Sequence, residues 1–561
     1  MTTLLQTLIQ LIMARDTSRR RDLLFLTVLF GSAFFLLLGH FGLIEPDEGR
    51  YAEIPREMLE RGDFITPVLN YVKYFEKPVL LYWLNAISFI VFGQNEFAAR
   101  FPSALSGLLT VLLTYHAGRT LFGRREGMMA ALILGSSVGF LVQGRYNIID
   151  MTLTFCMTAT LSCFIMAART EGRWQGRYYY LMYIFAALTV LAKGLIGIVL
   201  PGVVIVGYIL VTRRWKILRE MRLVTGALLF LLVAAPWFVL VSLKNPEFAR
   251  FFFIHEHFER FLTKVHKRYE PPWFFIPVLI GCMLPWSFFI PSAVLSTWKE
   301  RRSSGANALL FLALWVVLIF GFFSASSSKL IPYILPVFPA VALLTGRAFV
   351  VATELPGRIF TVAVPVLGAV LCIMGVGLLI YPHVVDHAEL SMSACVVGGV
   401  LFGAEGVILL AGTKRFTAAT LFVTLFLFSL VIEGVMPPFL LDKFVEERSS
   451  KKLGLIARSV MTPDTTIASI GYDHTLTFYS RRRVVILGGP GELEFGSKQG
   501  DQSAWFLGLP EFTALWKGSS PVLLSIDQGL LPYFSTILEP YQILGQQGRK
   551  KLLTNRTHQG G

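Results

Sequence analysis

The sequence predicts a polytopic α-helical membrane protein that ends in a small α/β domain. Hydrophobic residues make up 54% of the 561 positions and charged residues only 16%, whereas a soluble domain carries about 25% charged residues. Apolar stretches of about 20 residues, long enough to cross a bilayer as helices, recur through most of the chain. After about residue 437 they give way to short runs typical of strands.

Thirteen apolar stretches are predicted to span the membrane. They lie at residues 23–43, 98–121, 127–145, 151–168, 178–194, 196–211, 223–243, 273–296, 307–325, 331–350, 358–381, 393–412 and 416–435. A further run at 78–93 is short for a span. If it crossed, the basic loop at 119–125 would lie on the side opposite to Arg19–Arg21, against the positive-inside rule. We therefore expect 78–93 to lie along the outer surface, with the N-terminus cytoplasmic and the C-terminal domain outside.

The excess of positive charge follows this topology. The net charge is +15, but the basic residues cluster in short loops between apolar stretches, as is typical of cytoplasmic loops. This distribution argues against a nucleic-acid partner. The five cysteines all lie inside apolar stretches and form no CxxC pair, so neither a disulfide framework nor a zinc knuckle is predicted.

The domain organisation follows from the same change in composition. Residues 1–436 are predicted to form the membrane domain, with outer-face loops at about 44–97 and 244–272. Residues 437–548 are predicted to form the α/β domain, and 549–561 a disordered tail. Five strand-like runs (465–472, 482–487, 503–509, 521–527 and 541–546) alternate with helical stretches such as 451–460. The stretch GGPGELEFG at 488–496 lacks the spacing of a phosphate-binding loop and is interpreted as a turn.

Ionisable residues gather at the outer face, first in EPDEGRYAEIPREML at 45–59. This stretch is predicted to form a short surface helix with Asp47 as its N-cap, and Arg50 three residues later on the same face. The next element, NYVKYFEKPVLLYW at 70–83, carries Tyr74, Glu76, Lys77 and Tyr82. Each stretch has an alternative to a functional site. The charges at 45–59 could simply be solvated, and 70–83 could be an aromatic belt with a snorkelling lysine.

Three later elements add charge to this face. Asp150 lies at the outer end of a predicted span, where it is either a helix cap paired with Arg145 or part of a site. Lys193 is the only charged residue of its apolar stretch and could bind an anion there. The basic and aromatic loop 251–275 contains His255 and Arg260; its HxH spacing leaves a metal site open, but phosphate binding suits its composition better. Tyr333 follows in SSSKLIPYILP.

The order and spacing of these motifs resemble a known family. PDEGRYAEIPREML, YFEKPVLLYW, FAARFPSAL, NIIDMTLTF, LAKGLIG, HFERF and SSSKLIPYILP are similar to motifs of GT-C fold membrane glycosyltransferases. The nearest branch is that of the ArnT-like 4-amino-4-deoxy-L-arabinose transferases of lipid A, which are related to protein O-mannosyltransferases. The stretch YDHTLTFYSRRRVVILGGPGELEFG resembles the start of that family's periplasmic domain, while EKPV replaces the more frequent EKPP.

The resemblance implies a sugar donor linked to undecaprenyl phosphate and an acceptor at the periplasmic face of the bacterial inner membrane. It assigns the donor phosphate to Lys77, Arg260 and Tyr333, with Lys193 and Tyr74 close by. Asp47, Glu76 and Asp150 would form the acidic side of the cavity, braced by Arg50. Secondary candidates for this site are Glu48, Tyr82 and His255.

Direct displacement at the anomeric carbon predicts inversion of configuration. Asp47 would act as a general base on a protein hydroxyl, but would orient the sugar or its amine if the acceptor is a lipid A phosphate. Cations can neutralise the leaving phosphate, so we expect catalysis without a metal; a divalent ion beside Glu76, with His474 or His255, is the alternative.

Two other functions compete with this interpretation. A transferase with a different acceptor, such as a protein hydroxyl, core oligosaccharide or another envelope glycan, would share the same motifs. A lipid-linked sugar flippase would instead carry ionisable residues near mid-bilayer and broken helices in repeated halves. The charges of this sequence lie mainly at one face, which favours a transferase.

Overall fold

The computed structural model describes residues 2–14, 17–259, 270–302, 305–354, 357–385 and 390–556. The chain forms two compact units. The helical unit comprises residues 1–36, 103–240 and 249–440, and the mixed unit comprises residues 37–102, 241–248 and 441–561. Helices α5, α12 and α20 contribute residues to both.

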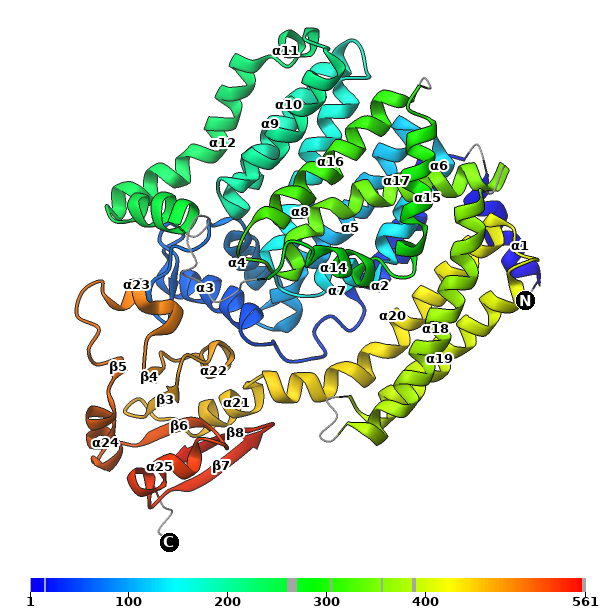
Figure 1. Ribbon diagram of the computed structural model, residues 1–561. Coiled ribbons are helices and arrows are strands. Elements are labelled where there is room, and N and C mark those ends of the chain that lie inside the picture. Colours follow the sequence, from blue (N-terminus) through cyan, green and yellow to red (C-terminus); the bar gives the residue numbers. More distant parts are fainter. Residues whose placement is uncertain are drawn as a thin grey trace. The chain divides into compact units, whose positions relative to one another are not determined.

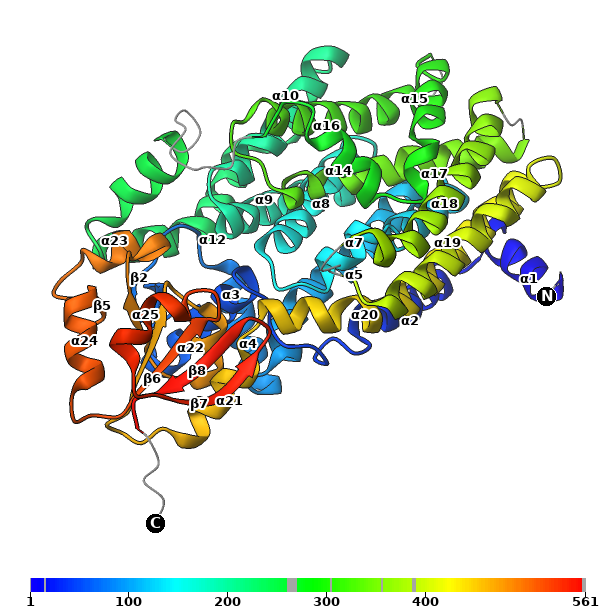
Figure 2. The same ribbon diagram turned by 60° about the horizontal axis from the view of Figure 1, so that its bottom comes forward.

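The helical unit contains long apolar helices (Figure 1). Its elements are α1 (Thr2–Met13), α2 (Arg19–Phe35), α5 (Glu96–Leu121), α6 (Arg124–Gly135), α7 (Val138–Gly144), α8 (Ile149–Ala167), α9 (Arg173–Lys193), α10 (Ile196–Thr212), α11 (Lys216–Glu220), α12 (Leu223–Lys244), the π-helix η1 (Arg250–Glu259), α14 (Phe275–Cys282), the 3-10 helix η2 (Trp286–Phe289), α15 (Ile290–Lys299), α16 (Ala306–Ala325), the 3-10 helix η3 (Ile331–Val337), α17 (Phe338–Glu354), α18 (Arg358–Val384), α19 (Met392–Gly412) and α20 (Ala418–Arg448). Figures 1 and 2 show α18 and α19 side by side. Small residues at their contact, such as Gly375 against Gly403, let the two backbones approach closely.

Every stretch predicted to span the membrane overlaps at least one helix. Among the described residues, eight helices are long and apolar enough to cross, and up to ten if each of two bent pairs counts as one span. The count of thirteen therefore stays a prediction. Helix α4 (Leu80–Phe92) has 13 residues, about 20 Å at 1.5 Å per residue, which is too short for a hydrocarbon core of about 30 Å.

Two of the predicted spans, 127–145 and 273–296, are not single helices. Helices α6 and α7 meet at 66°, and α14 meets the segment Trp286–Lys299 at 111°. Ser136 and Ser137 lie at the first break, where their hydroxyls donate to the carbonyl oxygens of Leu132 and Ile133 (both 2.6 Å). The second break contains Pro285, which has no N–H to continue the helix.

The mixed unit combines a helical hairpin region with an α/β sheet. Its elements are α3 (Asp47–Arg61), β1 (Val68–Leu69), β2 (Val72–Lys73), α4, α21 (Lys451–Val460), β3 (Thr466–Ile470), α22 (His474–Ser480), β4 (Val485–Leu487), the 3-10 helix η4 (Gly491–Leu493), α23 (Glu494–Ser497), β5 (Phe506–Leu507), α24 (Leu509–Lys517), β6 (Val522–Asp527), α25 (Leu531–Leu538), β7 (Gln542–Gln547) and β8 (Lys550–Thr554). The sheet has the order β5-β4-β3-β6-β8-β7, with β3 to β6 parallel and β7 and β8 antiparallel. All five predicted strand-like runs and the helix at 451–460 are confirmed.

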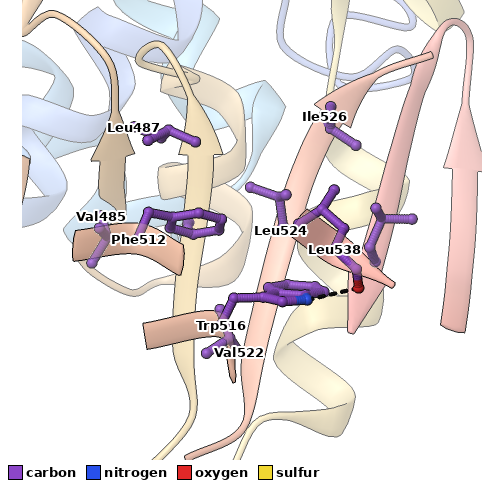
Figure 3. Close-up of a cluster of buried hydrophobic side chains, with 10 residues drawn as sticks. Val485, Leu487, Phe512, Trp516, Val522, Leu524, Ile526 and Leu538 are labelled. Carbon is purple, nitrogen blue, oxygen red and sulfur yellow. Dashed lines mark hydrogen bonds between the residues drawn. The ribbon is translucent and has the colours of Figure 1, made fainter. Parts of the chain in front are cut away.

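Helices cover both faces of this sheet because its buried strands are apolar on both sides. Alternate residues of β6 pack with Phe512 and Trp516 of α24 on one face (Figure 3), and Leu523 packs with α21 and α22 on the other. The indole of Trp516 donates to the carbonyl oxygen of Leu538 (2.8 Å), which ties α24 to α25.

The predicted disordered tail at 549–561 is wrong over its first half. Residues 550–554 form β8, which pairs with both β6 and β7. Leu552 and Leu553 are fully buried, and Lys550 donates to Asp473 (2.7 Å) and Ser450 (2.9 Å). The polar Lys550 and Lys551 make this stretch resemble a tail, although the apolar residues that follow them pack in the core.

Candidate active site

Helix α3 carries the charged stretch with which the outer-face motifs begin. It begins at Asp47 and ends at Arg61, where Gly62 adopts the left-handed conformation (φ 64°) that closes many helices. Pro46 occupies the N-cap position, so the predicted capping role of Asp47 is wrong. The shared face is confirmed, because Nη1 of Arg50 donates to Oδ1 of Asp47 (2.8 Å).

Glu48 lies on the opposite, buried side of α3. Its fully buried carboxylate accepts two hydrogen bonds from Arg100 (both 2.7 Å) and one from the backbone N–H of Ile44 (3.0 Å). Arg100 also donates to the carbonyl oxygens of Leu38, Phe41 and Gly42 (2.8–3.0 Å). This arrangement favours a structural role for Glu48, which fixes α3 to the start of α5.

Arg50 joins the predicted site to a carboxylate from the C-terminal part of the chain. Besides Asp47, its guanidinium contacts both oxygens of Glu492 (2.5 and 3.2 Å). The Arg50 side chain is only 10% exposed, so the fork geometry holds it firmly between two carboxylates.

His474 extends this network. Its Nδ1 lies 2.8 Å from Glu45, and its Nε2 contacts Glu492. Because both ring nitrogens face carboxylates, both must carry protons, and the ring is an imidazolium. Burial opposes this charge, but Glu492 and Glu45 raise the pKa of His474 to about 9. Despite their own burial, the His474 charge lowers the pKa of Glu45 and of Glu492 to about 2.

Tyr74 and Tyr82 lie in the electrostatic environment of Arg50, Glu76 and Glu492. Burial raises the pKa of both phenols, so they remain neutral hydrogen-bond donors. Among the described residues, the buried Tyr82 hydroxyl has no hydrogen-bond partner, which leaves it available to a bound molecule. Nζ of Lys77 donates to the carbonyl oxygen of Glu76 (2.9 Å).

The helical unit brings together three other predicted residues. Nζ of Lys193, at the end of α9, pairs with Asp150 at the start of α8. The same ammonium lies 4.4 Å from the ring centroid of Tyr333 in η3. Asp150 thus pairs with Lys193 rather than Arg145, whose guanidinium donates to the carbonyl oxygens of Ala33 and Leu36.

The loop predicted to bind phosphate lies partly outside the described residues. Arg260 lies outside them, and for His255 the structure describes only the backbone, within η1. In the described part of the chain, no group of three or more His, Cys, Asp or Glu side chains is arranged to hold a metal.

Three members of the network, Glu45, His474 and Glu492, are not among the site residues predicted from the sequence. Glu492 lies in the stretch interpreted as a turn, and His474 was considered only as a metal ligand. For His474 and Glu492 the available signal is the concentration of family-like residues at 472–496. Both lie more than 400 positions from Arg50, so no local pattern relates them to it.

Two further carboxylates lie within spanning helices. Oε1 of Glu405 in α19 and both carboxylate oxygens of Glu433 in α20 are buried and have no hydrogen-bond partner among the described residues. Ionisable groups are expensive to keep inside a membrane. Glu405 lies near the middle of α19 and is an exception to the expectation that charges lie mainly at the outer face, whereas Glu433 lies near the outer end predicted for the span 416–435.

The residues of each unit suit a substrate that carries negative charge. In the mixed unit, Arg50 and Lys77 offer cations and Tyr74 and Tyr82 offer neutral donors, beside the carboxylates of Asp47, Glu76 and Glu492; in the helical unit, Lys193 offers a cation beside Asp150. Such sites stabilise charge that develops on a leaving phosphate.

Comparison with known proteins agrees with both parts of the chain. A family model described as dolichyl-phosphate-mannose-protein mannosyltransferase matches residues 21–252, and one described as aminoarabinose transferase C-terminal domain matches 454–555.

Two relatives carry the name undecaprenyl phosphate-alpha-4-amino-4-deoxy-L-arabinose arabinosyl transferase. The protein of Pseudomonas aeruginosa (strain UCBPP-PA14) is 32% identical over 533 residues, which cover 91% of this chain and 94% of the relative. That of Pectobacterium carotovorum subsp. carotovorum (strain PC1) is 32% identical over 550 residues, covering 92% and 95%. The crystal structure of ArnT from Cupriavidus metallidurans bound to undecaprenyl phosphate matches with a TM-score of 0.83 and 29% identity, over 96% of this chain and 98% of that one.

Proposed function

The chain belongs to the family of undecaprenyl phosphate-α-4-amino-4-deoxy-L-arabinose arabinosyl transferases, and we propose that it transfers 4-amino-4-deoxy-L-arabinose from an undecaprenyl-phosphate-linked donor to a phosphate of lipid A. It is a membrane glycosyltransferase, and the GT-C fold class expected from its motifs is confirmed.

The observation that carries this proposal is the match over nearly the whole length to ArnT bound to undecaprenyl phosphate. The chemistry of the described residues supports it independently. A polyprenyl phosphate needs cations close to hydrocarbon, and the buried Lys193 lies at the end of an apolar helix. An amino sugar needs carboxylates and neutral donors, which Asp47, Glu76 and Tyr82 supply.

In the proposed reaction, a phosphate oxygen of lipid A attacks the anomeric carbon of the sugar. The bond from that carbon to the donor phosphate oxygen breaks, undecaprenyl phosphate leaves with the electron pair, and the configuration inverts. Lys77, Lys193, Arg260 and Tyr333 would bind the donor phosphate and stabilise its growing charge.

Because the attacking phosphate is already anionic, the reaction needs no general base. Asp47 and Glu76 would orient the sugar and its ammonium group, and their charge would stabilise positive character at the anomeric carbon. Arg50 and Tyr74 would hold these carboxylates in place, while Asp150 would fix the Lys193 ammonium.

Membrane insertion follows from the apolar helices and the family. We propose that the protein lies in the bacterial inner membrane, with its N-terminus in the cytoplasm and its C-terminal α/β domain in the periplasm. Its donor and lipid A would then meet at the periplasmic face, where the charged residues are expected.

Mass spectrometry of lipid A from a transferase-null Gram-negative host tests this function. We expect an aminopentose increment when the host expresses the wild-type chain, and its loss with Asp47→Asn, because the amide removes the charge that orients the sugar. Inserted protein of both forms must be present in equal amounts. Absence of the increment in the wild type, with the donor lipid present, would contradict the proposal and direct the search to other sugars or acceptors.

A further inference from the structure

The strand order of the C-terminal sheet marks a place where ligands bind in related architectures. From the central strand β3, the chain proceeds to β4 and β5 on one side and then to β6 on the other. In open parallel α/β sheets, ligands bind at the carboxyl ends of the strands where the order reverses. Here the carboxyl end of β3 leads through Gly471 and Asp473 into helix α22.

The carboxylate of Glu45, from the loop before α3, fills this place. It accepts hydrogen bonds from the backbone N–H groups of His474 (3.2 Å) and Thr475 and lies 2.8 Å from Nδ1 of His474. Its side chain is 17% exposed. Two backbone N–H groups and the His474 ring therefore bind an anion that belongs to the same chain.

Gly49 permits the close approach that this contact requires. A Cβ at this position would lie 2.7 Å from Cβ of His474 and 2.9 Å from the backbone nitrogen of Thr475, so any larger residue would push α3 away from α22. Figure 1 shows the two helices next to each other within this unit.

The contact continues without a break to the proposed catalytic residues. His474 bridges Glu45 and Glu492, Glu492 accepts two hydrogen bonds from Arg50, and Arg50 donates to Asp47. Arg50, Glu492 and His474 each contact two side chains of opposite charge, and Asp47 and Glu45 form the two ends of the network. Displacing His474 would therefore release Glu492 and change the orientation of Arg50.

We propose that helix α22 of the C-terminal domain binds Glu45 as an internal ligand, and that Glu45 and His474 are positioning residues that set Arg50 and Asp47 for transfer. This inference rests on the proposed function. It gives the C-terminal domain a part in the reaction, as the element that orients the catalytic helix.

A double-mutant cycle on the purified full-length protein tests it. His474→Phe keeps the ring that packs on Tyr472 (4.5 Å between centroids) but removes both donors, and Arg50→Lys keeps the charge but removes the fork. We expect each single change to lower kcat roughly tenfold or more. We expect kcat of the double variant to lie within about twofold of that of Arg50→Lys alone, because the two changes disrupt the same interaction. Multiplying losses would overturn the proposal.

Asn70→Ala supplies the matched control. Asn70 also ties the N-terminal loop to the C-terminal sheet, through two buried hydrogen bonds with the backbone of Val484 (2.8 and 2.9 Å), but the described contacts do not connect it to Arg50. Its effect on kcat should multiply with that of Arg50→Lys. If His474→Phe fails to fold, Glu45→Gln takes its place, because it removes the charge that pairs with His474 while its amide oxygen can still accept from one of the two N–H groups of α22.

Hydrogen exchange separates this inference from the transfer activity. We expect the amides of residues 47–50 to exchange at least tenfold faster in His474→Phe than in Asn70→Ala. If the wild type transfers no sugar, the proposed function fails, yet this difference would still support the positioning role. Equal exchange in the two variants would overturn that role whatever the activity.

Discussion

Replacing Arg100 with alanine is expected to lower the free energy of unfolding by about 3–5 kcal/mol, the range measured when one partner of a buried ion pair is removed. Arg100 is 4% exposed, and it provides five hydrogen bonds to Glu48 and to three backbone carbonyls. Its loss removes the guanidinium that neutralises the fully buried Glu48 carboxylate. A charge buried in this way costs far more than a broken surface pair.

Denaturant unfolding of the detergent-solubilised protein measures this loss. Arg61→Ala is the control, since Arg61 pairs with Asp63 at 3.5 Å and is 34% exposed, and such pairs contribute about 0–1 kcal/mol. Replacing Arg100 and Glu48 together with methionine should recover much of the stability, because no charge stays buried. A loss below about 1 kcal/mol for Arg100→Ala would show that water or a rearranged side chain reaches Glu48.

Replacing Lys193 with methionine is expected to lower the rate of transfer about 10²–10³-fold, the effect of removing one preorganised charge from an active site. The side chains of Lys193 and Asp150 are both 9% exposed. The Lys193 ammonium also lies against the ring of Tyr333. The variant loses the cation proposed for the donor phosphate and also leaves Asp150 uncompensated. Protein yield should fall with it.

The double variant Lys193→Met with Asp150→Asn separates these two consequences. It removes the uncompensated charge, so yield and thermal stability should return towards those of the wild type, while transfer stays low. Transfer and stability that recover together would show that the pair is only structural, and Lys193 would then leave the list of donor-binding residues.

The sequence was sufficient to predict the helices and the order of the strands because both depend on local patterns. Apolar stretches of helical length found every long helix, and β-branched runs between turns found five strands of the C-terminal sheet. The spacing of Asp47 and Arg50 on one helix also predicted their contact. Charges in an otherwise apolar chain indicated Lys193 and Asp150 as candidates.

Features that depend on distant partners could not be predicted in this way. Nothing local shows that Asp150 pairs with Lys193, or that Glu492 contacts Arg50 and His474 contacts Glu45 from more than 400 positions away. The N-cap position of α3 is Pro46 and not Asp47. The two lysines that begin β8 gave no sign of a strand, although the next two residues are buried. Resemblance to a family indicated which outer-face residues form the candidate site, but their contacts could be identified only from the folded structure.

Transfer by the purified protein in liposomes tests the proposed function itself. The reaction contains only this chain, undecaprenyl phosphate-linked 4-amino-4-deoxy-L-arabinose and lipid A, and the products are analysed by mass spectrometry and by NMR of the anomeric centre. We expect aminopentose on a lipid A phosphate with inverted configuration, together with released undecaprenyl phosphate. Intact donor and unmodified lipid A, in a preparation whose protein still binds undecaprenyl phosphate, would contradict the function proposed here.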